Sequence, residues 1–384
     1  MKLALLGAGK MGQAIAYDLS KYSSFEKIII LDENKKAQQT LQQILPDDSY
    51  IFQHHSSNDQ SFMKTLFSSV DIVISALPYF FNYPLTQLAI QTHTHFIDLG
   101  GNNSIVQQQR ALHKEAIKAG VIIIPDCGLA PGLVSVITKD IVEHYDTVKQ
   151  VRIRVGGIPL HPQPPWNYHL VFSAEGLLNE YTEDALILEK GKIKHKPSMT
   201  ELETLQFPPP FGEMEAFLTS GGCSTLPYTY KDIIESLDYK TIRYPGHCHS
   251  MRSIMHLGLT DKQPLSIDQT EITPRDLLII LFNQHLTSTD TDAVLVKIWA
   301  TGEQETISTY QEYSIIETGD DTTSMTAMMK TTGYPVSIIA QMIEQRLIVT
   351  SGVHSCEEII PCQTFFDLLQ ERGINIQQSK KRLI

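Results

Sequence analysis

The residues with the clearest chemical signature are Gly7, Gly9 and Gly12, which form the pattern G-x-G-x-x-G directly after an apolar run. The first glycine permits a tight turn, the second lets the backbone approach a diphosphate, and the third lets the following helix pack closely. The diphosphate then lies at the helix N-terminus, where free N–H groups and the helix dipole favour negative charge. The pattern predicts a dinucleotide site that Lys10 and Met11 also contact.

Asp32 lies twenty positions after Gly12, at the end of the apolar run 27–31. A carboxylate at this place accepts hydrogen bonds from the adenosine ribose hydroxyls and repels a 2′-phosphate, which favours NAD over NADP. Two alternatives stay open. Lys35 and Lys36 could bind a phosphate if their loop turned inward, and Asp32 could be an ordinary solvated turn residue.

Candidate site residues follow three further apolar runs, at 70–77, 95–99 and 121–124. In open parallel sheets the ligand crevice lies outside the carboxyl ends of the strands. We therefore expect the loops after these runs to face the nicotinamide end of a bound cofactor. The cofactor contacts predicted there are Leu77, Pro78 and Gly128, and the candidates for substrate binding or chemistry are Tyr79, Asp98 and Asp126.

The scaffold for these residues is predicted from the alternation of short apolar strands with helical patterns. A short strand is expected at 51–52, and helices are expected at 34–45, 85–91 and 106–119. Such alternation implies right-handed crossovers and a doubly wound parallel sheet of the α/β class.

A second domain is expected because 384 residues exceed the usual size of one core. Longer β-rich stretches appear at 148–155, 185–193 and 293–299, followed by a helical pattern at 333–347. We predict an NAD-binding Rossmann domain over 1–130 and an α+β domain on a mixed sheet over 131–345. The second domain would bind substrate and form a homodimer or larger homo-oligomer, and the segment 346–384 would return to the Rossmann domain.

Composition narrows the functional class. The net charge of −12 gives no electrostatic basis for binding nucleic acid or an anionic membrane. No apolar run reaches the roughly 18 residues of a membrane span, and the first residues lack a signal-peptide pattern, so we expect a cytoplasmic protein. The five cysteines are scattered and form no C-x-x-C pair, so we expect reduced thiols. We expect no metal site, because adjacent side chains such as His247, Cys248 and His249 seldom converge on one ion.

Long ordered segments resemble a known family over nearly the whole chain. They include DLGGN at 98–102, PDCGLAPG at 125–132, VGGIP at 155–159, VFSAEGLLNEY at 171–181, EAFLTSGGCSTLPYTY at 215–230, LDYKTIRYPGH at 237–247 and TAMMKTTGYPVSIIAQMI at 326–343. These segments resemble the saccharopine dehydrogenase family, and most closely its lysine 6-dehydrogenase branch.

The resemblance implies an NAD-dependent oxidoreductase that removes the ε-amino group of L-lysine. Hydride leaves Cε for the nicotinamide, and the imine hydrolyses to allysine and ammonia, after which allysine cyclises to 1-piperideine-6-carboxylate. Saccharopine reductases carry an Asp and a Cys where this chain has Ala130 and Val155. A saccharopine-type reaction is therefore the alternative, followed by a carboxynorspermidine-type dehydrogenase. A sensor that binds NAD(H) without turnover is the non-enzymatic alternative, because fold alone does not fix function.

Arg243 is the predicted substrate anchor. It lies in TIRYPGH, where the resemblance implies an arginine on a substrate carboxylate, and a guanidinium suits such a bidentate contact. A salt bridge between domains is the structural alternative. The residues expected to line the second-domain wall are Tyr168, Ser173, Asn179 and Tyr181.

The base is predicted less directly. The ε-ammonium must lose a proton before hydride leaves, which favours His247 because imidazole titrates near the working pH. Glu180 could serve if burial raised its pKa. Tyr79 could hold the amine or the attacking water, and Asp98 and Asp126 could attract the ammonium. For each of these residues a purely structural role is the alternative, since buried polar groups normally satisfy loop backbone.

Overall fold

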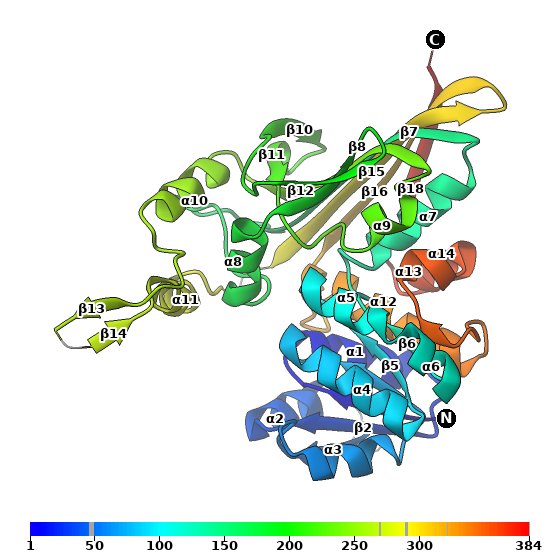
Figure 1. Cartoon of the computed structure of the whole chain (residues 1–384). Coiled ribbons are helices and arrows are strands. Elements are labelled where there is room, and N and C mark those ends of the chain that lie inside the picture. The colour runs from blue at the N-terminus through cyan, green and yellow to red at the C-terminus, as the bar shows by residue number, and fades with distance from the viewer. Residues whose placement is uncertain (46–49, 269, 289–290, 321, 384) are drawn as a thin grey trace.

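A computed structural model describes residues 1–45, 50–268, 270–288, 291–320 and 322–383, and it contains two large β-sheets (Figure 1). In the described chain the first sheet has seven parallel strands in the order β17-β6-β5-β4-β1-β2-β3, which confirms the doubly wound α/β prediction. These strands are β1 (Lys2–Leu6), β2 (Lys27–Asp32), β3 (Ile51–His54), β4 (Ile72–Ser75), β5 (His95–Asp98), β6 (Ile122–Ile124) and β17 (Gly352–Val353).

Helices cover both faces of this sheet, because its central strands are apolar on both sides, as is usual for parallel strands. One face packs against α3 (Gln60–Phe67), α4 (Asn82–Thr92) and α6 (His113–Ala119). The other face packs against α1 (Lys10–Tyr22), α2 (Lys35–Ile44) and α12 (Ala327–Glu344). The short helix η2 (Tyr79–Phe81) leads into α4, and α5 (Asn103–Ala111) precedes α6.

The second sheet is mixed, as predicted, because β12 pairs with β7 in parallel and the other neighbours are antiparallel. Its main path runs β10-β11-β12-β7-β15-β16-β18, and a β8–β9 hairpin joins it at β12. The strands are β7 (Thr147–Pro159), β8 (Ala185–Glu189), β9 (Lys192–Lys196), β10 (Glu203–Phe207), β11 (Gly212–Leu218), β12 (Ile234–Arg243), β15 (Asp292–Gln304), β16 (Ile307–Thr318) and β18 (Gln377–Arg382).

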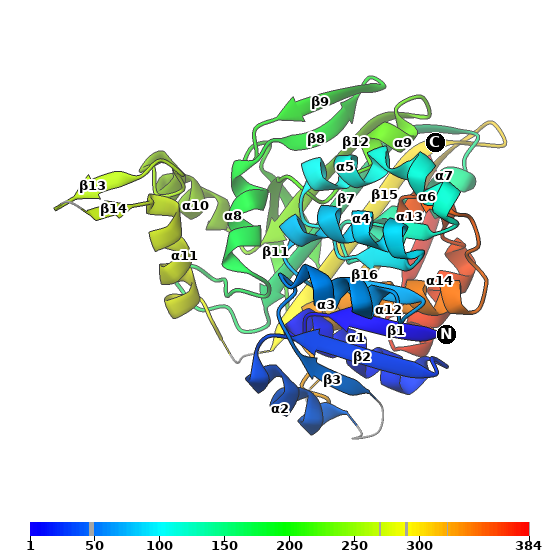
Figure 2. The same cartoon turned by 60° about the horizontal axis from the view of Figure 1, so that its bottom comes forward.

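Helices of the second half surround this sheet and extend into an arm. They are α7 (Leu133–Glu143), α8 (Ala174–Thr182), α9 (Leu226–Tyr230), α10 (His247–His256), α11 (Pro274–His285), α13 (Cys356–Ile359) and α14 (Cys362–Glu371). The arm ends in a small hairpin of β13 (Leu265–Ile267) and β14 (Thr270–Ile272), which projects away from the body in both views (Figure 2). In the described part of the chain, no helix is long and apolar enough to span a membrane.

Three elements differ from the sequence predictions. The helix expected at 106–119 is broken at Leu112 into α5 and α6, and the His113 ring contacts the backbone of β17. The β-rich stretch at 185–193 contains a turn and forms most of the β8–β9 hairpin, because Lys190 and Gly191 both adopt positive φ in its two-residue turn. Helix α12 begins at Ala327, earlier than expected, since Asp292 accepts hydrogen bonds from its first N–H groups.

The C-terminal segment contributes to both sheets. Strand β17 pairs with β6 and β18 pairs with β16. A fully buried ion pair joins Asp18 of α1 to Arg372 after α14, with 2.6 Å between Oδ1 and Nε. Ser337 and Gln341 of α12 donate hydrogen bonds to the same carboxylate. Because a buried charge is tolerated only when it is paired, this group ties α12 and α14 to the Rossmann helices.

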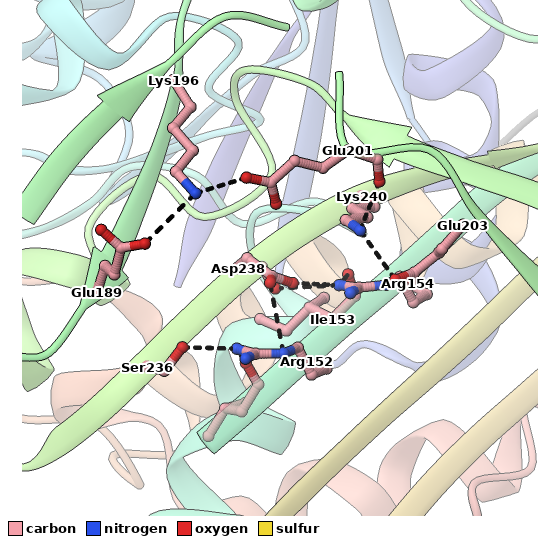
Figure 3. Close-up of polar contacts among 11 residues, drawn as sticks. Arg152, Ile153, Arg154, Glu189, Lys196, Glu201, Glu203, Ser236, Asp238 and Lys240 are labelled. Carbon is pink, nitrogen blue, oxygen red and sulfur yellow. Dashed lines mark hydrogen bonds and ion pairs between the residues drawn. The ribbon is translucent and has the colours of Figure 1, made fainter. Parts of the chain in front are cut away.

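An ion network lies on the face of the second sheet opposite the cleft described below (Figure 3). Arg154 of β7 is 1% exposed and pairs with both Glu203 and Asp238. Lys240 Nζ lies 2.8 Å from Glu203, and the Arg154 guanidinium lies 5.1 Å from the Trp299 ring centre. The network therefore joins β10, β12, β7 and β15, and it holds the far side of the strands that carry the site.

Candidate functional site

A cleft of about 670 Å³ lies between the carboxyl ends of the first sheet and the second sheet. Most of the sequence-predicted residues meet in it. On the Rossmann side the lining includes Gly9, Lys10, Met11, Gly12, Leu77, Pro78, Tyr79 and Gly128. On the other side it includes Val155, Ser173, Glu175, Asn179, Glu180, Glu183, Tyr239, Thr241 and Arg243.

The glycine loop has the shape that a dinucleotide requires. A Cβ on Gly12 would lie 2.0 Å from the Gly7 carbonyl oxygen, so only glycine permits this packing of α1 on the loop. Gly7 itself has a φ of +93°. A Cβ on Gly9 would meet nothing within 4 Å, which leaves open space in front of the first N–H groups of α1. Among the described residues, no side chain caps that helix N-terminus. The loop therefore offers free N–H donors to a diphosphate.

Asp32 lies at the end of β2 beside this loop. Its carboxylate accepts hydrogen bonds from the backbone N–H groups of Ala8 and Asn34, both at 2.7 Å. Two acceptor sites of a carboxylate remain available after these bonds. The side chain is half-buried, so it orders the glycine loop and can still accept from ribose hydroxyls. Lys35 and Lys36 are exposed in the first turn of α2.

Asp98 and Asp126 lie behind the cleft wall and do not line it. Asp98 is fully buried and accepts hydrogen bonds from the Gly100 N–H and from Gln109 Nε2, both at 2.7 Å. Asp126 accepts a hydrogen bond from the Ser224 hydroxyl. Burial raises the pKa of Asp98 to about 6 and that of Asp126 to about 8. Because both carboxyls lie outside the cleft, their positions argue against the predicted roles in attracting the substrate. Both residues accept hydrogen bonds from loop residues instead.

Arg243 is 2% exposed and ends β12 at the cleft. Its Nε donates to the Tyr181 hydroxyl at 2.9 Å, and Nη1 donates to the Ile242 and Gly157 carbonyls at 2.9 and 3.4 Å. The Tyr168 ring lies 4.8 Å from its guanidinium carbon. Tyr168 does not line the cleft, so it supports the predicted anchor from behind rather than contacting substrate.

His247 is 3% exposed and lies outside the cleft lining. Its Nε2 is 3.1 Å from the hydroxyl of Tyr181, which is fully buried and, contrary to the sequence prediction, does not line the cleft either. Burial, and then the nearby Arg243 charge, lower the pKa of His247 to about 3. A group that holds a proton only in strong acid and cannot reach the substrate is a poor base, so these observations argue against the predicted catalytic role of His247.

Glu180 has the access to the cleft and the near-neutral pKa that His247 lacks. Its carboxylate lines the cleft, and within the described chain no residue donates a hydrogen bond to it or forms a direct ion pair with it. Burial raises the pKa of Glu180 to about 7, although the Arg243 charge acts in the opposite direction. A carboxyl that titrates near neutral pH inside a ligand cleft is a candidate general base.

Ser173 and Asn179 line the cleft from the start and the last turn of α8. The Ser173 hydroxyl accepts from the Gly176 N–H at 3.1 Å and caps the helix. Asn179 accepts from Arg275 at 2.6 Å, and its buried Nδ2 has no partner among the described residues. Sequence reasoning missed the cleft residues on α11 and α12, which include Asn283, Met328 and Thr332. Met328 and Thr332 lie within the segment 326–343 that resembles the family, but nothing in that segment shows which of its residues reach the cleft, because only the tertiary fold brings these helices there.

Models of two domains, both named for saccharopine dehydrogenase, together match almost the whole chain. The saccharopine dehydrogenase NADP binding domain matches residues 3–124, and the saccharopine dehydrogenase C-terminal domain matches residues 128–374. The chain belongs to the saccharopine dehydrogenase family. The half of the chain that contains the glycine loop matches the first of these domains, and the half that contains Arg243 matches the second.

Individual relatives agree with this assignment. The mitochondrial alpha-aminoadipic semialdehyde synthase of Mus musculus is 23% identical over 289 residues, which cover 71% of this chain and 30% of the relative. The saccharopine dehydrogenase (NADP(+), L-glutamate-forming) of Saccharomyces cerevisiae is 26% identical over 212 residues, which cover 52% and 46%. The chain thus spans less than half the length of these relatives. A structure of apo saccharopine dehydrogenase (L-Glu forming) from Saccharomyces cerevisiae shares the fold, with a TM-score of 0.79 at 19% identity over 99% of both chains.

Proposed function

We propose that this protein is a dehydrogenase of amino acids that oxidises the ε-carbon of L-lysine with NAD as hydride acceptor. The observation that carries the proposal is the charge of the cleft. Its second-domain wall presents one guanidinium, from Arg243, and three carboxylates, from Glu175, Glu180 and Glu183. L-Lysine brings one carboxylate and two ammonium groups, so its charges complement this wall.

The choice of NAD rests on the Rossmann side of the cleft. The glycine loop fits a diphosphate, and the Asp32 carboxylate stands where a 2′-phosphate would be repelled. Lys10 begins α1 beside the loop and would add a positive charge near the diphosphate. A nicotinamide bound in the cleft supplies the acceptor for the hydride.

The chain itself supplies binding and proton transfer. Arg243 binds the α-carboxylate and thereby fixes the position of the substrate chain. The Glu180 carboxylate accepts a proton from the ε-ammonium, which leaves a neutral amine whose lone pair can form the C=N bond as hydride leaves Cε. Tyr79 lies across the cleft and holds the amine or the water. Water then hydrolyses the imine, so lysine, NAD⁺ and water give allysine, ammonium, NADH and one proton.

The second candidate is a saccharopine-type reaction, which the names of the relatives favour. Saccharopine carries three carboxylates, whereas the second-domain wall of the cleft presents a single arginine. Ala130 and Val155 both line the cleft where saccharopine reductases carry an Asp and a Cys. Neither side chain can form a hydrogen bond, which disfavours this reaction.

The test is the absorbance of reduced nicotinamide with purified protein, NAD and either L-lysine or saccharopine, together with an assay for ammonia. Lysine-dependent NADH formation with matching ammonia release supports the proposal. Turnover of saccharopine alone, or of allysine with glutamate in the reverse direction, would replace it with the second candidate. The same assay with NADP tests the cofactor.

A further inference from the structure

The guanidinium of Arg243 is held by three of its five N–H groups. Nε and Nη1 donate to the Tyr181 hydroxyl and to two backbone carbonyls. Nη2 takes part in none of these bonds, and Arg243 lines the cleft.

Tyr181 connects Arg243 to His247. The Arg243 Nε–H can only donate, so the Tyr181 oxygen is the acceptor in that 2.9 Å bond. The hydroxyl proton of Tyr181 is then free to donate to His247 Nε2, at 3.1 Å. This direction requires an imidazole that is neutral and carries its proton on Nδ1. Burial and the Arg243 charge, which lower the pKa of His247, are consistent with that state.

The position of the imidazole is fixed by its surroundings. Glu215 accepts hydrogen bonds from the N–H groups of Gly246 and Cys248, at 2.9 and 2.6 Å, and so holds the first turn of α10. The Phe217 ring lies parallel to the imidazole at 6.4 Å, and the Tyr168 ring meets it edge-on at 5.0 Å. The imidazole at the end of the hydrogen-bond chain is therefore held in place, because both the backbone and the ring of His247 are enclosed.

We propose that Tyr181 and His247 are positioning residues, which orient the guanidinium of Arg243 through this directed chain so that Nη2 meets a substrate carboxylate. Side-chain entropy opposes such an orientation in an isolated arginine. Neutral His247 supplies the final acceptor, and Tyr181 transmits its position to Nε. The inference rests on the proposed function only in taking an amine with a carboxylate as the substrate.

The test compares L-lysine with 1,5-diaminopentane, which lacks the carboxylate and is measured as a competitive inhibitor. Tyr181→Phe removes the hydroxyl, and His247→Phe removes the acceptor while keeping a ring. We expect each to raise the KM for L-lysine about tenfold, equivalent to about 1.4 kcal/mol. We expect kcat and the inhibition constant of the diamine to change by less than about twofold. His247→Gln offers an amide oxygen to Tyr181 and should restore the KM. Tyr145→Phe is the matched control, since this buried hydroxyl lies outside the cleft lining and donates to the Ala300 and Thr309 carbonyls of the second sheet.

A loss of affinity for lysine and diamine together, a fall in kcat without a change in KM, or equal effects of His247→Phe and His247→Gln would overturn the positioning role. Failure of the proposed function gives a different result, because the wild-type protein would then oxidise saccharopine instead of lysine. In that case the KM for saccharopine, which also carries carboxylates, decides the role of the same variants. If neither compound is oxidised, the calorimetric affinity of the NAD-loaded protein for L-lysine decides it.

Discussion

Replacing Glu180 with Gln should distinguish the contribution of the general base from that of the other cleft residues. Burial places the pKa of this carboxyl at about 7. With that value, about a tenth of the groups are ionised at pH 6 and nearly all at pH 9, so kcat/KM should rise about tenfold over this range. The sign follows from the chemistry, because only the carboxylate can accept the proton. The lysine ε-ammonium titrates near 10.4, so the free amine, whose oxidation needs no base, appears only at higher pH.

The assay is the pH dependence of kcat/KM for NADH formation from L-lysine. Glu180→Gln should lower kcat/KM by about 10²- to 10⁴-fold at pH 9 and should lose the inflection near pH 7, while a rise from the free amine at higher pH remains. Glu175→Gln, on the same helix and also in the cleft, is the matched control: it removes one carboxylate that attracts the ammonium groups, so it should raise KM but keep the inflection near pH 7. A wild-type profile without an inflection near pH 7, or similar effects of the two variants, would refute Glu180 as the base.

Three further perturbations test the scaffold. Asp32→Ala should weaken NAD binding and narrow the preference over NADP, and unchanged affinities in calorimetry would contradict the cofactor assignment. Gly9→Ala should fold normally, because its Cβ enters open space, but it should bind dinucleotide weakly, because that space is where the diphosphate lies. Gly12→Ala should also lower the melting temperature. Normal NAD binding by Gly9→Ala would show that the diphosphate binds elsewhere. Arg154→Met should lower the free energy of unfolding by about 2 kcal/mol, because Glu203 and Asp238 lose a buried charged hydrogen-bond partner and keep only Lys240 and Arg152. Exposed Lys149→Met should cost under about 1 kcal/mol in the same urea titration, and equal effects would contradict the role of the network.

The Rossmann half could be predicted from sequence because its signals are local. The glycine loop, Asp32 and the residues at strand ends follow from the spacing of apolar runs. The break at Leu112 could not be predicted in this way, because it accompanies a contact between His113 and the distant strand β17. The β8–β9 turn did carry a local signal, because Lys190 and Gly191 interrupt the apolar residues between 185 and 193.

The site was predicted only in part, because residue type does not determine burial. The motif around Arg243 indicated an anchor, and the structure brings this guanidinium to the cleft. His247 was favoured as the base for its ordinary pKa, but its burial outside the cleft removes both access and basicity. Glu180 gains basicity from the same burial. Burial thus acts in opposite directions on the two candidate bases, because it lowers the pKa of His247 and raises that of Glu180, and burial depends on tertiary structure.

The most direct test of the central claim is to supply L-lysine deuterated at C6 and to measure the mass of the reduced cofactor. The Arg243 anchor and the Glu180 base place the ε-carbon at the nicotinamide, so we predict that the NADH formed carries one deuterium and that its formation is slowed by the label. NADH without deuterium would show that hydride comes from another carbon, and it would contradict ε-deamination even if lysine were consumed.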